Sequence, residues 1–264
     1  MVLSEEMILS FLASLILPFM RVSSCVMAMF ALGSRSVPSV VKLTLSLALT
    51  VIVYPLVPEM QNIPDIFSPG FFLLAGYQII IGIMLGYATQ FISQIFVVAG
   101  QVVAMQTGLG FASLVDPVSG SNTPVVGQFF TVLATILFFV VNGHLVLFRL
   151  LAESFVTLPV GFEGFFSIPY MEFARFGSLM FSLALSLSLS SICAMLLVNF
   201  TFGVMTRAAP QLNIFSLGFA VSLLCGLIVL RLVLSGFMRH WNEAMNRVFD
   251  LSCSLINTSC PGIF

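Results

Sequence analysis

Six long apolar stretches dominate this sequence and restrict its possible folds more than any other feature. A helix needs about 20 mostly apolar residues, each rising about 1.5 Å, to cross the roughly 30 Å hydrocarbon core of a bilayer. Clusters of Gly and Pro separate the stretches, as is typical of loops between helices. The six stretches are Met7–Leu32, Val40–Val57, Phe71–Met105, Val125–Phe155, Phe176–Met205 and Ile214–Met238. We therefore predict an all-α, polytopic, membrane-type helical protein.

The composition excludes a soluble protein. Hydrophobic residues make up 59% of the chain and charged residues 7%, whereas soluble domains contain roughly 45–50% and about 25%. So few charges cannot cover a surface that faces water, so most of the surface must face lipid or other protein. The net charge is -1 and Lys42 is the only lysine. The chain therefore lacks the basic patch that nucleic-acid binding requires.

The charges between the stretches predict an orientation in the membrane. Arg35 and Lys42 lie around the first connection and Arg207 in the fifth, and positive charges favour the cytoplasmic side. We therefore expect the odd-numbered connections in the cytoplasm and both termini outside. The third stretch is too long for an upright span, so it must tilt, bend or extend beyond the hydrocarbon. The tail, Arg239–Asp250, is amphipathic and is expected to lie on a surface.

Two arginines lie inside apolar stretches, Arg21 in the first and Arg231 in the last. A charged side chain at the bilayer centre costs about 2.5–3.5 kcal/mol on insertion scales, so it normally faces a partner or a wet cavity. The alternative is that the arginine extends along its helix to reach the membrane surface. For Arg21, which lies deeper in its stretch, we favour a partner or a cavity. For Arg231 both alternatives stay open.

Amides form a stripe along the third stretch. Gln90, Gln94 and Gln101 fall within about 40° of one another on a helical wheel with 3.6 residues per turn. Amides that face lipid would lack hydrogen-bond partners, so this face meets another helix or lines a polar passage. The fifth stretch carries a serine every four residues, a spacing that lets helix backbones approach closely. These serines, which predict helix partners in this chain or another subunit, are Ser178, Ser182, Ser186 and Ser190.

The segment between the third and fourth stretches, residues 107–124, combines glycines with apolar side chains. Glycine permits backbone angles that other residues avoid, whereas Leu109, Phe111, Leu114 and Val115 are unexpected in an exposed loop. Irregular backbone at membrane depth is tolerated only where it is buried in protein or lines a cavity. The segment is therefore either a re-entrant turn packed in protein or a flexible apolar stopper in a channel mouth.

The residues that usually carry chemistry do not form a recognisable set. We interpret the five cysteines as small apolar fillers, although Cys253 and Cys260 could pair in an oxidising compartment. Asn142, Gly143 and His144 form a polar break within the fourth stretch, and His144 is typical of a structural group that is hydrogen bonded. We find no P-loop, HExxH or nucleophile–base set, and we therefore expect no catalytic, cofactor-binding or metal-binding residues.

Two other classes of function compete with a structural role. The arginines and glutamines would suit a secondary transporter or a small-solute channel. Such proteins usually show internal repeats and midplane carboxylates, which we do not find here. A membrane-embedded enzyme would need a catalytic set, which the sequence does not supply.

Five blocks of the sequence, taken together and in order, resemble a known family. They are Pro18–Arg21 with Arg35–Pro38 and Lys42; Ile81–Gly86 with Ala99–Gln101; Gly108–Pro117; Asn142–His144 with Ser154, Phe155 and Pro159; and Arg207–Phe215. On these residues, almost the whole chain resembles the FliR family of the flagellar type III export gate. The related subunits of virulence injectisomes share the last block, whereas the third looks more flagellar. Many relatives carry a glutamate where this chain has Gln78, so no role for that carboxylate is carried over.

The resemblance implies a pore or gate subunit of the flagellar type III protein export apparatus, which helps to form and seal the channel for unfolded flagellar proteins. An injectisome export-gate subunit remains the alternative. It implies bent helical hairpins in two parts: a FliP-like part, residues 1–175, with a plug loop at about 106–123, and a FliQ-like hairpin, residues 176–264, with an amphipathic tail. The implied partners are FliP and FliQ in a hetero-oligomeric core, FlhB, and exported unfolded proteins in transient contact.

The resemblance also implies a location and a set of site residues. The location is the bacterial inner membrane and the flagellar basal body, with the core raised to the periplasmic level, and no cofactor or nucleic acid is implied. The plug would comprise Leu109, Gly110, Phe111, Ala112, Leu114, Val115, Asp116 and Pro117. The hairpin tip that meets partner subunits would comprise Arg207, Pro210, Gln211, Asn213 and Phe215. The polar or pore-facing candidates inside the membrane remain Arg21, Gln90, Gln94, Gln101 and Arg231.

Overall fold

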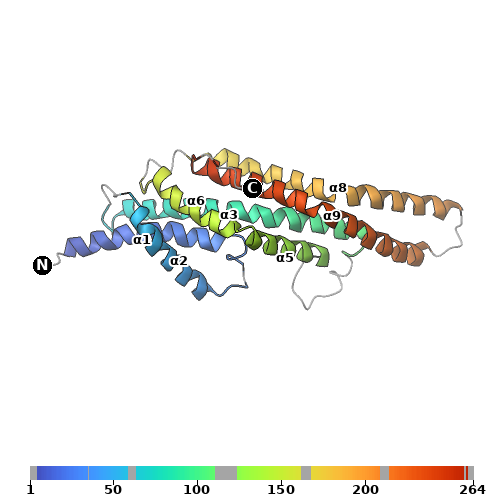
Figure 1. Ribbon diagram of the computed structural model, residues 1–264, viewed down its shortest axis with the longest axis horizontal. Helices are drawn as coiled ribbons and strands as arrows, with labels where there is room; N and C mark the ends of the chain where they lie inside the picture. Colours follow the sequence, from blue (N-terminus) through green and yellow to red (C-terminus); the bar gives the residue numbers. More distant parts are fainter. Residues whose placement is uncertain are drawn as a thin grey trace. The chain divides into compact units, whose positions relative to one another are not determined.

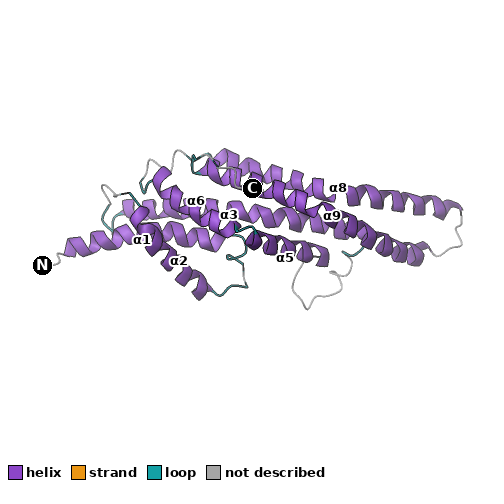
Figure 2. Cartoon of the chain, viewed as in Figure 1, coloured by secondary structure: helices purple, strands orange, loops and turns teal. Residues whose placement is uncertain are grey.

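The computed structural model describes residues 5–34, 36–58, 64–110, 124–161, 168–208, 214–258 and 260, and these parts consist of helices and short connections (Figures 1 and 2). No strand occurs among the residues so described, which confirms the all-α prediction. In chain order the helices are α1 (Glu5–Ala28), α2 (Ser39–Val53), the 3-10 helix η1 (Tyr54–Leu56), α3 (Pro69–Thr107), α5 (Val125–Val140), α6 (Gly143–Thr157), α8 (Tyr170–Ala208) and α9 (Ile214–Leu255).

Four helical segments of the described chain are long and apolar enough to cross a membrane. A fifth span results if α5 and α6, which meet at 64°, are counted as one broken segment. The described apolar part of α1, Leu12–Ala28, is shorter. The overlong third stretch forms a single helix of 39 residues, α3. Polytopic membrane character is therefore confirmed.

The chain divides into two compact units. The first comprises Met1–Phe91, Phe138–Phe176 and Asn246–Phe264, and the second comprises Ile92–Leu137 and Gly177–Met245. The boundaries fall inside α3, α5, α8 and α9, so each of these helices contributes to both units. The implied division near residue 175 stays a prediction, because these units do not follow the order of the chain.

In the first unit, α1 and α3 cross at two glycines of α3. A Cβ atom added at Gly82 would collide with the Ser24 hydroxyl and the Arg21 carbonyl, and one at Gly86 would collide with the Cys25 carbonyl. Small residues at a crossing let two helix backbones approach this closely. The approach brings the buried polar groups of α1 within reach of α3.

Asn142 forms the bend between α5 and α6. It adopts a left-handed conformation with φ 59°, which Asn tolerates better than most residues. The ring of His144 lies beyond the bend, 5.2 Å from that of Phe139 between centroids, and its Nδ1 atom is buried without a partner. The polar break predicted within the fourth stretch is therefore confirmed.

In the second unit, aromatic rings join α3, α5 and α9. The ring of Phe237 on α9 lies 4.7 Å from Phe96 of α3 and 5.5 Å from Phe130 of α5, between centroids. Trp241 of α9 also packs on Phe96, at 5.6 Å. Such offset and edge-on ring pairs contribute about 0.5–1.5 kcal/mol beyond their buried area.

The expected surface tail is not a separate element. Residues Arg239–Asp250 continue α9, which ends at Leu255. Their amphipathic pattern has a structural cause, because one face is buried in protein: Trp241, Ala244, Met245, Val248 and Phe249 are each at most 2% exposed. Apart from the half-buried His240, the polar residues of the same segment lie on the other, exposed face.

Replacement of Gly82 by alanine should destabilise the first unit. The new methyl group would displace α1 from α3, and overpacking of this kind costs about 1–3 kcal/mol. Gly76→Ala on the same helix is the matched control, because a Cβ there meets nothing within 4 Å and alanine favours helix by up to about 1 kcal/mol. Thermal unfolding of the detergent-purified chain measures both, and equal midpoints would contradict the close crossing.

Candidate functional site

Arg21 of α1 is completely buried and joins three helices of the first unit. Its Nε donates to the Gln78 side-chain oxygen of α3 at 2.8 Å. Its Nη1 donates to the Ser154 carbonyl oxygen at 2.8 Å, and its Nη2 to the Leu158 carbonyl oxygen at 2.9 Å. The planar fork of arginine suits such a divergent set of acceptors better than the single ammonium of lysine. Arg21 thus meets protein rather than extending to the membrane surface.

The C-terminal end of α6 supplies the electrostatic complement of this charge. Ser154 and Leu158 lie at that end, where unpaired carbonyls give a helix its partial negative charge. The Phe155 ring adds its face, with the guanidinium carbon 4.4 Å from the ring centroid. No carboxylate of the described residues forms an ion pair with Arg21. The charge is therefore compensated by dipoles and by a π face rather than by a counter-ion.

Gln78 is the least satisfied member of this group, which we call the Arg21 cluster: Arg21, Gln78, Ser154, Phe155 and Leu158. Gln78 is fully buried, and its Nε2 donor has no hydrogen-bond partner. A buried donor left unpaired costs about 1–3 kcal/mol. The acceptor side of the amide nevertheless points at Arg21.

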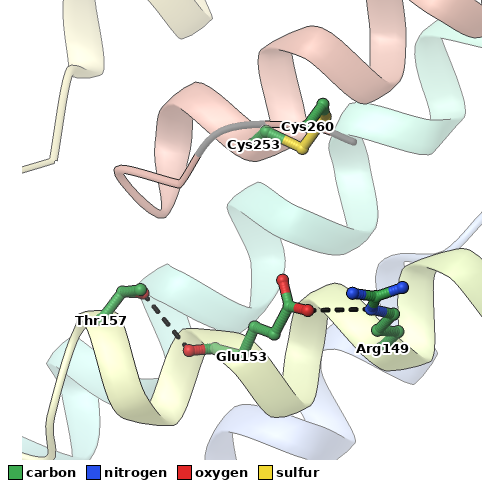
Figure 3. Close-up of polar contacts among 5 residues, drawn as sticks. All are labelled: Arg149, Glu153, Thr157, Cys253 and Cys260. Carbon is green, nitrogen blue, oxygen red and sulfur yellow. Dashed lines mark hydrogen bonds and ion pairs between the residues drawn. A yellow bond between two sulfur atoms is a disulfide. The ribbon is translucent and has the colours of Figure 1, made fainter. Parts of the chain in front are cut away.

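An exposed ion pair on α6 contrasts with the Arg21 cluster. Arg149 Nε lies 2.8 Å from Glu153 Oε1, and the Thr157 hydroxyl donates to the Glu153 carbonyl at 3.4 Å (Figure 3). The Arg149 side chain is 68% exposed. Surface pairs at this spacing contribute only about 0.3–0.5 kcal/mol. Of Arg21 and Arg149, Arg21 is therefore expected to contribute more to the stability of the first unit.

The other polar candidates lie in less enclosed positions. Gln90 is half-buried, and its Nε2 donates to the Met29 carbonyl at 3.5 Å. Gln94 is exposed and Gln101 half-buried, so the amide stripe is packed only in part. Arg231 is exposed on α9.

The predicted plug loop begins at a tightly packed base in the second unit. Gly108 ends α3 with φ 79°, a conformation that favours glycine, and the Gly110 N–H donates to the Ala104 carbonyl at 3.0 Å. A Cβ on Gly226 of α9 would meet Thr107 Cβ at 2.6 Å, so α9 passes directly over the last turn of α3. Leu109 is half-buried and Gly110 buried. The other plug candidates lie outside the described residues: Phe111, Ala112, Leu114, Val115, Asp116 and Pro117.

Both ends of that loop are held near one crossing. A Cβ on Gly100 of α3 would lie 2.5 Å from the Gly127 Cα of α5. Gly100 lies on α3 before the loop and Gly127 on α5 after it, so the two helices that flank the loop pack directly against each other. The loop is consequently anchored at both ends by helices of the second unit.

The hairpin-tip candidates are described only in part. Arg207 is exposed in the last turn of α8, and Phe215 falls in the first turn of α9. Pro210, Gln211 and Asn213 lie outside the described residues.

The serine stripe of α8 does not pack within this chain. Its four serines, Ser178, Ser182, Ser186 and Ser190, are all exposed. The buried face of α8 is instead made by Leu183, Ala184, Leu187, Ser188, Ser191 and Met195. Of the two partners that the sequence left open, a helix of this chain is therefore excluded for the described residues.

Sequence reasoning identified Arg21 but not its partners. Gln78 lies on a different side of α3 from the glutamine stripe, and Ser154 lies in an unremarkable part of α6. The signals available for Gln78 were an amide inside an apolar helix and the glutamate that the resemblance places at this position. No group of three His, Cys, Asp or Glu side chains that could hold a metal ion occurs in the parts of the chain that were described.

Comparison with known proteins gives a consistent result. Residues 12–248 match the model of the family "Bacterial export proteins, family 1". The chain is 35% identical to the flagellar biosynthetic protein FliR of Escherichia coli (strain K12), over 96% of this chain and 97% of that protein. It is 35% identical to the protein of the same name from Pectobacterium carotovorum subsp. carotovorum, over 90% and 91%. The Bacillus subtilis (strain 168) protein of that name is 26% identical, over 86% and 88%.

Replacement of Arg21 by leucine should destabilise the chain far more than the same change at Arg231. Arg21→Leu leaves the Gln78 side-chain oxygen and the Leu158 carbonyl oxygen without their donor in the interior, at about 1–3 kcal/mol each. For a domain of this size, each kcal/mol corresponds to roughly 2–4 °C in the unfolding midpoint. Thermal unfolding in detergent tests this, with Arg21→Lys as an intermediate case. A midpoint for Arg21→Leu equal to that of Arg231→Leu would show that the cluster does not stabilise the protein.

Gln78 should tolerate glutamate better than leucine. Gln78→Glu keeps an acceptor for Arg21 Nε, removes the unpaired Nε2 donor and supplies a counter-charge, whereas Gln78→Leu removes the acceptor. We expect a midpoint at or above that of the native chain for glutamate, and a loss of about 1–3 kcal/mol for leucine. The opposite order in the same unfolding assay would contradict the assigned hydrogen bond.

Proposed function

We infer the function of this chain from its family, because it belongs to the bacterial export proteins, family 1, over almost its whole length. We propose that it is a FliR-type subunit of the flagellar type III protein export apparatus in the bacterial inner membrane. In this role it helps to form and seal the channel through which unfolded flagellar proteins pass, and it performs no bond-making chemistry. The flagellar assignment is preferred to an injectisome because the relatives compared above are named as flagellar proteins.

The observation that carries the proposal is that the interior of the second unit is filled by side chains, whereas α8 leaves an apolar and serine-lined face exposed. The interior of the second unit is filled by Phe96, Phe130, Phe237 and Trp241, which leaves no wide polar passage among these residues. The exposed face of α8 combines the serine stripe with large apolar side chains such as Leu185 and Leu189. A conduit for a polypeptide would therefore form between subunits rather than within this chain.

One feature of α8 supports helical partners from other subunits. The exposed serines on α8 permit close approach by a helix of another subunit, and we assign FliP and FliQ to this role in a hetero-oligomeric core. FlhB would join the same core. We retain the FliP-like part, residues 1–175, and the FliQ-like hairpin, residues 176–264, as part of the proposal, together with a basal-body location and a core raised to the periplasmic level.

The anchored loop after α3 supports a role in sealing. A stopper must move or deform without detaching, and a loop held at both ends by a close helix crossing meets that need. Its base is closely packed, since Thr107 and Gly226 touch and Gly108 ends α3 in a left-handed conformation. Its apolar side chains would close the channel to ions by excluding water.

The assembly proposal predicts co-purification. When this chain is produced with its FliP and FliQ partners, an affinity tag on the chain should recover all three in a fixed ratio after size-exclusion chromatography. Ser186→Trp should lower that recovery, because a large side chain blocks close helix approach. The matched control is Ser188→Ala, at a buried position of the same helix. A monodisperse monomer that ignores both partners would contradict the proposal.

The sealing proposal predicts a leak. Deletion of Gly110–Ser119 should leave complex yield unchanged but let ions or small dyes cross the membrane of cells that produce the whole gate. A Gly/Ser segment of equal length is the control for loop length: it keeps a glycine at 110 and removes the apolar side chains. If apolar contact makes the seal, this variant should leak as well. Unchanged conductance for both variants would remove the plug assignment.

A further inference from the structure

We propose that Cys253 and Cys260, at the end of α9, form a disulfide bond that a thiol–disulfide oxidase makes on the periplasmic side of the membrane. This end of the chain would then face the oxidising compartment. The inference concerns sidedness and modification. It does not depend on the proposed export function.

The local backbone brings the two cysteines together. Their Cα atoms are 5.7 Å apart (Figure 3), within the usual 4.4–6.8 Å for disulfides. The chain reverses at Asn257, which has φ 53°, as the Thr258 N–H donates to the Cys253 carbonyl at 3.0 Å and the Asn257 N–H to the Ser254 carbonyl at 3.1 Å. These are the two hydrogen bonds of a Schellman helix end. The helix end itself therefore carries Cys260 back onto α9.

Cys260 is also positioned against the preceding turns of the helix. Its Sγ atom lies 3.3 Å from the Phe249 carbonyl oxygen. The other three cysteines, Cys25, Cys193 and Cys225, are free. The interpretation of all five cysteines as apolar fillers is thus wrong for this pair, because a helix-end motif that hydropathy does not register brings them together.

The chemistry of the pair requires an oxidant. Two thiols lose two protons and two electrons as the sulfur–sulfur bond forms. A thiol–disulfide oxidase accepts both electrons: one thiolate attacks its disulfide, the second resolves the mixed disulfide, and the oxidase leaves as a dithiol. Bacteria maintain such oxidants in the periplasm, while cytosolic thiols are kept reduced. A closed Cys253–Cys260 pair therefore reports the compartment of this chain end.

The length of α9 allows its two ends to lie on opposite sides of the membrane. A continuous helix of 42 residues measures about 63 Å, more than the roughly 40–45 Å of a bilayer with its headgroups. If α9 crosses the membrane, its ends lie on opposite sides. Arg207, just before α9, favours the cytoplasmic side, which puts the cysteines outside. Arg239 and Arg247 favour the reverse by count, and the disulfide decides between the two.

Closure has a structural consequence for the first unit. The last turns of α9 bury Val248, Phe249, Leu251 and Leu255. Helix ends normally fray, and a covalent link from Cys253 to the returning chain opposes that fraying. The disulfide thus keeps the end of α9 packed in the core of this unit.

Thiol trapping in growing cells tests the oxidation. The full chain carries Cys25→Ala, Cys193→Ser and Cys225→Ser, so that the pair alone remains. Cells are quenched with N-ethylmaleimide, and the extracted chain is treated with polyethylene-glycol maleimide before or after reduction. We expect no mass shift before reduction and a shift by two polymer chains after it. In cells without the periplasmic oxidase, N-ethylmaleimide should block both thiols, so that neither sample shifts. Blocked thiols in normal cells would overturn the proposal.

Labelling of single cysteines tests the sidedness. With Cys253→Ser added, a membrane-impermeant charged maleimide should label Cys260 in cells whose outer membrane alone is permeabilised. The matched control has Cys260→Ser and Arg207→Cys as well, and it should react only after the inner membrane is disrupted. The reverse pattern would overturn the proposal. Because the trapping experiment uses the native pair, its result stands even if a single-cysteine variant fails to accumulate.

Discussion

The hydrogen bonds of Arg21 are the interaction on which the first unit depends. A guanidinium in hydrocarbon is costly, and here α3 and the C-terminal end of α6 take up its N–H groups. Because those acceptors come from separate helices, the charge fixes α1 against both. The close crossing at Gly82 belongs to the same arrangement, because the backbone carbonyl of Arg21 packs directly against Gly82. A polar group inside an apolar helix thus specifies which helices meet.

Hydropathy was sufficient to predict the helices, and it was insufficient to predict their contacts. The six stretches became helices, and the break at Asn142 was visible because a polar Asn-Gly-His run interrupts an apolar segment. The need of Arg21 for a partner was also predictable from the cost of burying a charge. The identity of the hydrogen-bond partners of Arg21 was not predictable, because Gln78 lies 57 residues away and Leu158 lies 137 residues away in the sequence. No periodicity in one stretch encodes a contact with another.

The differences between expectation and structure share one physical cause. A pattern states that a face is buried, but it does not state what covers the face. The amphipathic residues Arg239–Asp250 were expected on a surface, whereas their apolar side packs inside the protein. The serine stripe of α8 predicted a helix partner in this chain or in another subunit, and its exposure leaves only the second for the described residues. For exposed faces of this kind, membership of a family indicates a partner that the sequence alone does not.

A double-mutant cycle between Arg21 and Gln78 tests the central claim most directly, namely that polar groups in these apolar helices are satisfied inside the protein. The measured quantity is the coupling free energy from the thermal stabilities of the native chain, Arg21→Leu, Gln78→Leu and the double variant. Residues in one hydrogen-bond network show couplings of about 0.5–3 kcal/mol. The account predicts a value in this range, with the double variant less destabilised than the sum of the two single ones. Strict additivity would contradict it.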